Sequence, residues 1–136
     1  MPECFIATTV LEAIADHAQE AWPDECCGLL IGRDRRVLAS RRARNRSADP
    51  YRRFLLDPAD QFAAIRVARA SGLHVIGAYH SHPRSEPVPS PTDARNADPA
   101  LLHVIVRPNG IGRPAEVRAW CLDGGNFREC PFVPLP

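Results

Sequence analysis

Apolar residues near the start of the chain recur every three or four positions over residues 10–21, with acidic and amide side chains between them. This spacing predicts an amphipathic helix that packs one face on a core. Thr9 followed three residues later by Glu12 fits a capping box at the start of the helix, and Pro23 ends it.

A second helix is predicted over residues 58–70. Asp57 precedes it in the N-cap position, and the proline after Asp57 suits a first helical turn. We expect Phe62, Ile65 and the aliphatic stem of Arg69 to face inward. A third, short helix is predicted over 91–97.

Short apolar and β-prone runs separate these helices and predict strands. They cover residues 4–6, 28–31, 37–39, 54–56, 73–79, 101–106, 117–122 and 127–133. Prolines in the last run place it at the edge of a sheet, whereas residues 43–50 are polar and irregular. Strands interspersed with helices predict a single α/β domain over residues 1–136.

The composition is that of an ordinary globular protein, with 45% hydrophobic and 24% charged residues. No run is long enough for a transmembrane helix, and the start lacks the basic and apolar segments of a secretory signal. We therefore expect a cytoplasmic protein. The five cysteines are odd in number and lack the spacing of a disulfide framework, so we expect reduced thiols.

The net charge is only +1, but all 17 basic residues are arginine and nine of them fall within residues 33–53. The segment is either a solvated edge and loop or a basic surface for an acidic partner. No nucleic-acid-binding motif accompanies it, which makes nucleic acid an unlikely partner.

Candidate chemistry is concentrated in residues 79–93. His80 and His82 end a predicted strand two residues apart, so both imidazoles can point to one side. A proline-rich loop follows, and then Ser90 in an N-cap position with Asp93 in the first helical turn. Two imidazoles and a carboxylate form the ligand set of an open zinc site. The alternative is that the histidines are ordinary hydrogen-bonded groups and that Asp93 only stabilises the helix start.

The full pattern is His-x-His, seven residues, Ser, two residues, Asp, and it resembles the signature of the JAMM (MPN+) metallopeptidases. A glutamate followed closely by Cys-Gly and an apolar strand lies upstream in that family, as Glu25 with Cys26, Cys27 and Gly28 does here. The resemblance spans Glu25 to Asp93. It implies a curved mixed sheet with packed helices, akin to the cytidine deaminases in architecture.

The same resemblance implies one zinc ion per chain, held by His80, His82 and Asp93. Glu25 corresponds to the residue that acts as general base, and Ser90 to the residue that hydrogen-bonds the oxyanion. We also expect Tyr79 to line the cleft as a substrate-binding residue. Whether Cys26 or Cys27 approaches the metal is left open by the sequence.

Members of the JAMM family cut peptide or isopeptide bonds after the C-terminal Gly-Gly of ubiquitin-like proteins. In length the chain resembles most the small stand-alone bacterial members, which act on ubiquitin-like sulfur carrier proteins and release cysteine or trim the C-terminus of the carrier. The motifs of other zinc proteases and of zinc deaminases are absent. Alternative functions are a non-catalytic MPN-type scaffold and a hydrolase of other small amides. A homodimer is compatible with the sequence.

Overall fold

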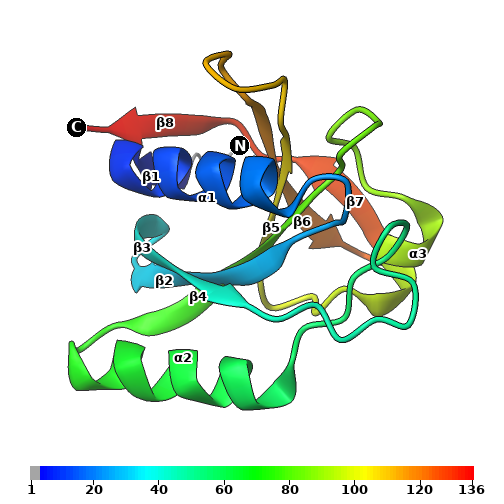
Figure 1. The fold of residues 1–136 in the computed structure, drawn as a ribbon. Helices are drawn as coiled ribbons and strands as arrows, with labels where there is room; N and C mark the ends of the chain where they lie inside the picture. Colours follow the sequence, from blue (N-terminus) through cyan, green and yellow to red (C-terminus); the bar gives the residue numbers. More distant parts are fainter. Residues whose placement is uncertain (1–3) are drawn as a thin grey trace.

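The computed structural model describes residues 4–136, which form eight strands and three helices (Figure 1). In chain order they are β1 (Cys4–Ala7), α1 (Thr8–Ala21), β2 (Cys27–Arg33), β3 (Arg36–Ala43), α2 (Pro58–Ala70), β4 (His74–Ser81), α3 (Pro91–Asn96), β5 (Leu102–Arg107), β6 (Glu116–Asp123), β7 (Asn126–Glu129) and β8 (Phe132–Leu135). Residues 1–3 lie outside the described residues. The expectation that the chain lacks a secretory signal rests partly on them. No helix among the described residues is long and apolar enough to cross a bilayer.

All the strands belong to one mixed sheet in the order β7-β6-β5-β4-β2-β3-β1-β8. β2 is antiparallel to both β3 and β4, and β4 is parallel to β5. The parallel β4–β5 pair is joined by a long crossover that holds the proline-rich loop and α3. This topology puts the segment of greatest chemical interest between two central strands.

The sheet is strongly curved, as predicted. β7 and β8 lie at opposite edges of the strand order, yet only Cys130 and Pro131 separate them in the chain. Three peptide steps span at most about 11 Å, so the two edges must approach each other. The Cys4 N–H donates to the Pro131 carbonyl at 3.3 Å, and the Cys130 N–H donates to the Ala119 carbonyl at 2.8 Å.

One long helix covers each face of the sheet (Figure 1). α1 buries Val10, Ile14 and Ala18, which follow the predicted spacing and pack into the main core. α2 buries Ala64 and Ala68 against a smaller cluster on the other face. Alanine side chains let the α2 backbone approach the sheet closely, so this layer is thin.

Three local predictions were wrong. Phe62 is 64% exposed because the inward face of α2 is formed by its alanines. Residue Ala7, not Thr9, is the N-cap of α1, and no side chain caps this helix, because β1 runs directly into it. Residues 54–56 form only an isolated bridge between Asn45 and Leu56.

One further boundary changed, and that of the second helix was confirmed. The predicted last strand is divided into β7 and β8, and Pro131, which lacks an N–H, lies in the interruption. The second helix starts as predicted, with the Asp57 carboxylate accepting hydrogen bonds from the N–H groups of Ala59 and Asp60. Arg69 is exposed and Ile65 is only partly buried.

Candidate metal centre and cleft

His80 is the last but one residue of β4, in the middle of the sheet, and His82 follows directly after the strand's last residue, Ser81. The extended chain turns both side chains to the same face, and they are only 5% and 6% exposed. The His82 N–H donates to the Val106 carbonyl at 2.9 Å, so the chain still runs beside β5 at this point. The two imidazoles are therefore placed by sheet geometry.

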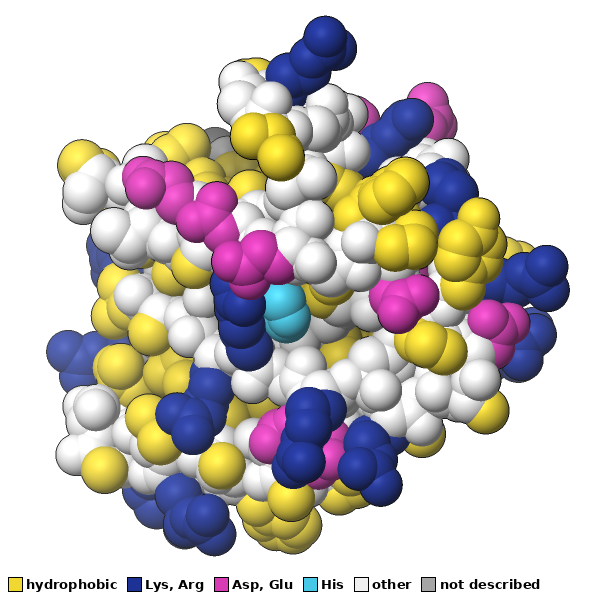
Figure 2. Space-filling model, viewed as in Figure 1, with side chains coloured by type: hydrophobic (Ala, Val, Ile, Leu, Met, Phe, Trp, Pro, Cys, Tyr) yellow, Lys and Arg dark blue, Asp and Glu magenta, His cyan; other side chains and the backbone are white. Residues whose placement is uncertain are grey.

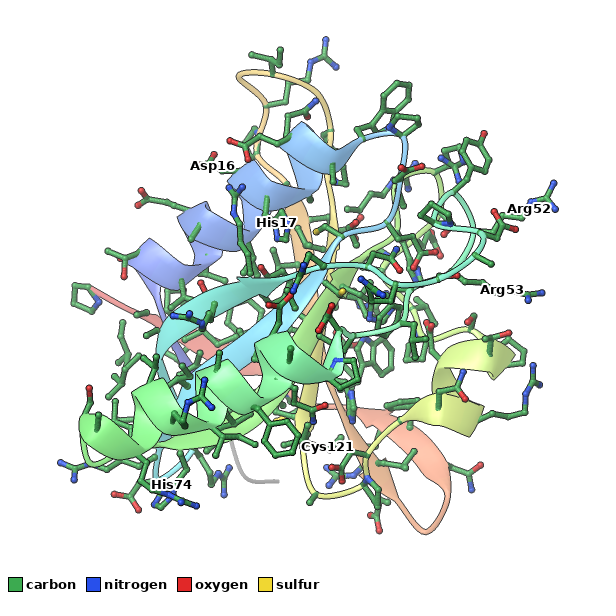
Figure 3. The ribbon with its side chains drawn as sticks, turned by 60° about the horizontal axis from the view of Figure 1, so that its bottom comes forward. Asp16, His17, Arg52, Arg53, His74 and Cys121 are labelled. Atoms are coloured by element: carbon green, nitrogen blue, oxygen red, sulfur yellow. The ribbon has the colours of Figure 1, made fainter. Side chains whose placement is uncertain are left out.

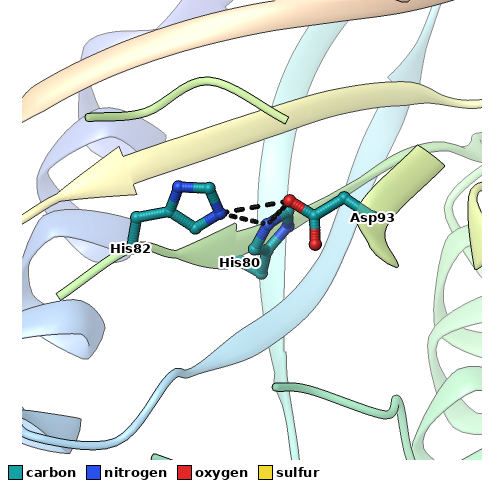
Figure 4. A group of neighbouring side chains, drawn as sticks. All are labelled: His80, His82 and Asp93. Atoms are coloured by element: carbon teal, nitrogen blue, oxygen red, sulfur yellow. Dashed lines mark hydrogen bonds and ion pairs between the residues drawn. The ribbon is translucent and has the colours of Figure 1, made fainter. Parts of the chain in front are cut away.

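Three ligand atoms converge at this point (Figure 4). The Nε2 atoms of His80 and His82 are 3.2 Å apart, and each lies 3.1 Å from Oδ2 of Asp93. Within residues 4–136 this is the only group of three His, Cys, Asp or Glu side chains arranged to hold a metal ion. The sequence-predicted ligands are thus brought together.

Asp93 is held by the start of α3. Its Oδ2 accepts a hydrogen bond from the Ser90 N–H at 2.9 Å, while the Asp93 N–H donates to Ser90 Oγ at 3.0 Å. This reciprocal pair is a capping box, with Pro91 in the first turn. The carboxylate is therefore oriented by the backbone of Ser90, whatever the side chain at position 90.

Contacts outside the ligand group orient the imidazoles. His82 Nδ1 lies 2.8 Å from the Glu86 carbonyl, which can only accept, so Nδ1 carries a proton and, in the neutral imidazole, the lone pair of Nε2 faces the centre. The Phe54 ring stacks on His80 with ring centroids 4.2 Å apart. Neither contact was predicted, because neither has a recognisable spacing in the sequence.

The charges in the group are strongly coupled. Burial alone would raise the pKa of Asp93, but hydrogen bonds from His80 and His82 hold it well below its usual range. Burial lowers the pKa of His80. Burial also opposes protonation of His82, but its bonds to Asp93 and the Glu86 carbonyl prevail and raise the pKa.

This donor set fits zinc. In a tetrahedral site with ligand distances of about 2.0–2.1 Å, neighbouring ligand atoms are about 3.3 Å apart. The triangle formed here has sides of 3.1, 3.1 and 3.2 Å. Two neutral imidazole nitrogens and one carboxylate oxygen match the preference of zinc for mixed nitrogen and oxygen ligands, with the fourth position left for water.

Glu25 lies just before β2, beside this group. Cys27 pairs with His80 across the sheet, which brings the preceding residues close to the end of β4. Burial raises the pKa of Glu25 to about 8; the charge of His82 lowers it and that of Asp93 raises it. A half-buried carboxylate that interacts with two of the three ligands, His82 and Asp93, is suited to exchange protons near neutral pH.

The backbone of Glu25 is held on both sides. Its N–H donates to the Pro50 carbonyl at 2.8 Å, and its carbonyl accepts from Asn45 Nδ2 at 3.0 Å. Asn45 Nδ2 also donates to the Arg53 carbonyl at 2.9 Å, and Asn45 Oδ1 accepts from the N–H groups of Ser47 and Leu55. Asn45 therefore uses its full hydrogen-bonding capacity to fix this loop.

Arg84 joins the two sides of the cleft. It extends from the proline-rich loop, donates to the carbonyls of Pro23 and Tyr51, and stacks on the Tyr51 ring at 3.5 Å. Its charge also lowers the pKa of Glu25. The buried Ser81 adds a further link, since its Oγ accepts from the Cys26 N–H at 2.9 Å. No role was predicted from the sequence for either of these supporting residues, although Ser81 matches the usual residue of the JAMM family.

A cavity of about 530 Å³ opens beside the ligand group. Its walls come from the loop before α2, the central strands, α3 and β7. The lining residues are Arg52, Arg53, Phe54, Leu55, Leu56, Gln61, Ala78, His80, Pro89, Ser90, Thr92, Asp93, Asn96, Ala97, Asp98, Leu101, His103, Ile105 and Phe127. Two of the ligands, His80 and Asp93, and Ser90 thus lie at a largely apolar cleft, as substrate sites commonly do.

Tyr79 is not part of this cleft, which corrects the expectation that it binds substrate. Adjacent strand residues face opposite sides, so Tyr79 points away from His80 into the main core and is only 1% exposed. Its hydroxyl lies 2.7 Å from His17 Nδ1. A Cβ atom on Gly28 would lie 2.3 Å from the Tyr79 ring, so the ring requires glycine there.

The cysteines next to Glu25 do not join the metal group. Cys27 Sγ lies near the carbonyls of Ala43 and Arg44, at 3.9 and 3.6 Å. Burial raises the pKa of Cys26 to about 11 and that of Cys27 to about 12. All five cysteines are in the reduced thiol form, as predicted.

Comparison with known proteins agrees with this geometry. Residues 7–123 match the family described as prokaryotic homologs of the JAB domain. The chain is 35% identical over 131 residues to a desampylase of Haloferax volcanii, with 91% of each chain covered. It is 30% identical over 107 residues to the probable TtuB-protein conjugate cleaving protease of Thermus thermophilus, covering 79% of this chain and 72% of that one. It is also 29% identical over 131 residues to the CysO-cysteine peptidase of Mycobacterium tuberculosis, covering 93% and 87%.

Solved structures show the same fold. A protein of Desulfitobacterium hafniense superposes with a TM-score of 0.84 at 28% identity, covering 97% of this chain and 92% of that one. A JAB1/MPN domain protein of Archaeoglobus fulgidus superposes with a TM-score of 0.60 at 22% identity, covering 95% and 98%. The family match and the named relatives together show that this chain belongs to the prokaryotic JAB family and is a hydrolytic enzyme.

Proposed function

We propose that this enzyme is a zinc-dependent peptidase that hydrolyses the bond after the C-terminal Gly-Gly of a ubiquitin-like sulfur carrier protein. The leaving group is cysteine or a short peptide. The observation that carries the proposal is the convergence of His80, His82 and Asp93 at 3.1–3.2 Å, with Glu25 beside them.

One zinc ion per chain would be held by the two Nε2 atoms and by Oδ2 of Asp93. A zinc ion bound there lowers the pKa of water and polarises a carbonyl group. The imidazole of His82 is preset for this task, because its Nδ1–H already donates to the Glu86 carbonyl. The capping box likewise presets the carboxylate.

In the proposed reaction Glu25 transfers the proton, and Ser90 stabilises the negative charge that develops on the substrate oxygen. The Glu25 carboxylate takes a proton from the attacking water and passes it to the leaving nitrogen, which balances the hydrolysis. The Ser90 hydroxyl donates to the oxyanion. Among residues 4–136 its Oγ accepts from the Asp93 N–H and makes no other hydrogen bond, so its own hydrogen is available for this bond.

The substrate class rests on the relatives and on the shape of the cleft. One relative is named for cleaving TtuB–protein conjugates and another for cleaving CysO-cysteine. The buried position of His80 requires the scissile carbonyl to come close to the floor of the cleft. A tail without side chains can approach that closely, which favours Gly-Gly.

The proposal is tested with zinc-loaded enzyme and a ubiquitin-like carrier bearing cysteine after its Gly-Gly, followed by intact mass. We expect about one zinc per chain. Glu25→Gln should keep the zinc and lose roughly 100-fold or more in turnover, because it removes only the base. His82→Ala should lose both zinc and turnover.

Glu12→Gln is the matched control, since Glu12 is exposed on α1, and it should behave as wild type. Replacing the last glycine of the carrier by valine should lower kcat/KM by more than about tenfold. Full activity of Glu25→Gln would exclude the base role. Equal cleavage of the valine carrier would favour a hydrolase of other small amides.

A further inference from the structure

The arginines of residues 33–53 do not form one uniform basic surface. Several are already paired within the chain. On the face drawn in Figure 2, dark blue side chains lie in several separate places, some of them beside magenta acidic ones. The paired ones are Arg42 with Glu20, Arg44 with Asp57 and Asp60, Arg46 with Asp57, and Arg36 over the Phe5 ring. The hypothesis that all of residues 33–53 form one docking surface must therefore be restricted to part of this segment.

Arg52 and Arg53 differ from these. Both are exposed, both line the cavity, and their side chains project outward from the loop before α2 (Figure 3). Among the contacts resolved over residues 4–136, neither guanidinium has a hydrogen bond or ion pair. Their loop is nonetheless fixed, since both backbone N–H groups donate to the Asp49 carbonyl at 3.2 and 3.0 Å.

Apolar side chains adjoin this pair at the rim. Leu55 lines the same cavity and is 59% exposed, and the half-buried Phe54 lines it as well. Arginine together with aromatic and other apolar side chains is the composition found in the centre of protein interfaces. The rim thus has the character of a protein-binding surface rather than of a solvated edge.

We propose that Arg52 and Arg53 form the docking surface for acidic side chains on the folded body of the substrate, beside the point where its tail leaves it. This inference rests on the proposed function. The tail must lie in the cavity to reach His80 at its floor, so the body must remain at the mouth. Two unpaired positive charges, carried on a loop whose backbone is fixed, lie at that mouth and select an acidic surface by charge complementarity.

The test compares Arg52→Glu/Arg53→Glu with a control that makes the same change in net charge. Arg33→Glu/Arg66→Glu is suitable, because both arginines are exposed and neither lines the cavity. Each enzyme is assayed on an intact carrier and on a short synthetic peptide with the same tail. Reversal at the rim should raise KM for the carrier by about tenfold or more, leave kcat within about twofold, and flatten its dependence on salt.

Kinetics on the peptide should be unchanged, because it lacks the folded body, and the control should match wild type on both substrates. An unchanged KM for the carrier, or the same loss on the peptide or in the control, overturns the inference. If Arg52→Glu/Arg53→Glu loses affinity for DNA while its kinetics on the carrier are unchanged, the inference is overturned and the two arginines are a nucleic-acid contact instead. Wild-type enzyme that cleaves neither substrate overturns the proposed function instead.

Discussion

The two sides of the cleft are built in different ways. On the ligand side, His80 and His82 are two residues apart, Ser90 and Asp93 form a capping box and are three residues apart, and His82 bonds Glu86 four residues on. On the other side, Glu25 is held by Asn45, 20 residues away. Arg84 holds the same region, because its guanidinium donates to the carbonyl of Pro23, which is 61 residues earlier in the chain.

This difference matters for function. Local contacts orient the ligands as soon as the strand and the helix start are formed, so the ligand group tolerates changes elsewhere. The position of Glu25 depends instead on loop 45–55, which has no regular structure. Loss of one loop contact should therefore affect proton transfer without affecting metal binding.

The largest effect among the variants that test this comparison should come from Ser90→Gly. Glycine at an N-cap costs only about a few tenths of a kcal/mol relative to serine, and the backbone N–H at position 90 that orients Asp93 remains, so zinc affinity and thermal stability should change little. Turnover should fall by roughly 100-fold, because the hydroxyl donor to the oxyanion is lost. Zinc titration, melting temperature and kcat measured together separate the cap from the oxyanion role. Wild-type turnover in this variant would leave Ser90 as a cap only.

The same contrast explains what could be predicted from the sequence. The helix start at Ser90 and Asp93 and the shared face of His80 and His82 follow from fixed local periods, and the structure confirms both. Phe62 was misplaced because apolar periodicity does not show that alanines already fill the inward face of α2. Tyr79 was misplaced although strand alternation alone puts it opposite His80.

The contacts made by loop 45–55 could not be predicted from the sequence, for a different reason. A polar segment such as residues 43–50 has many possible hydrogen-bond partners, and only the tertiary fold selects among them. Asn45 therefore gave no signal in the sequence, although it bonds four separate backbone groups.

An intermediate effect is expected from Asn45→Asp. The change keeps the size and the acceptor oxygens but removes the Nδ2 donor, so the carbonyls of Glu25 and Arg53 would face a carboxylate oxygen. Glu25 should shift, and kcat should fall by about tenfold, because small displacements of a catalytic group are costly. The zinc content should stay that of wild type.

Asn109→Asp is the matched control. Asn109 Nδ2 donates to the Pro114 carbonyl at 2.8 Å in the loop between β5 and β6, which does not touch Glu25. Its kcat should be unchanged. If Asn45→Asp lost zinc as well as turnover, the two sides of the cleft would not be independent, and the comparison above would fail.

The smallest effect concerns the opposite face of β4, where His17 bonds the Tyr79 hydroxyl at 2.7 Å. Burial lowers the pKa of His17 to about 4; the charge of Arg42 lowers it further and that of Glu20 opposes this. An unfolded chain binds the same proton at about pH 6.5. Between these values the unfolded state holds the extra proton, so stability falls as the pH drops from about 6.5 towards 4.

His17→Gln keeps a hydrogen-bonding group for Tyr79 but cannot titrate, so it should remove this part of the slope. The measurement is the free energy of unfolding in urea at pH 7 and pH 5, without zinc. Glu25 titrates in the opposite sense, because its raised pKa makes the folded state hold the proton, but it does so equally in both proteins. The difference between the two slopes therefore isolates His17. Since His17 is only half-buried, solvent screening should keep the difference below about 1 kcal/mol. Parallel slopes would show that this histidine titrates normally and that the pH response of the fold comes from the cleft face alone.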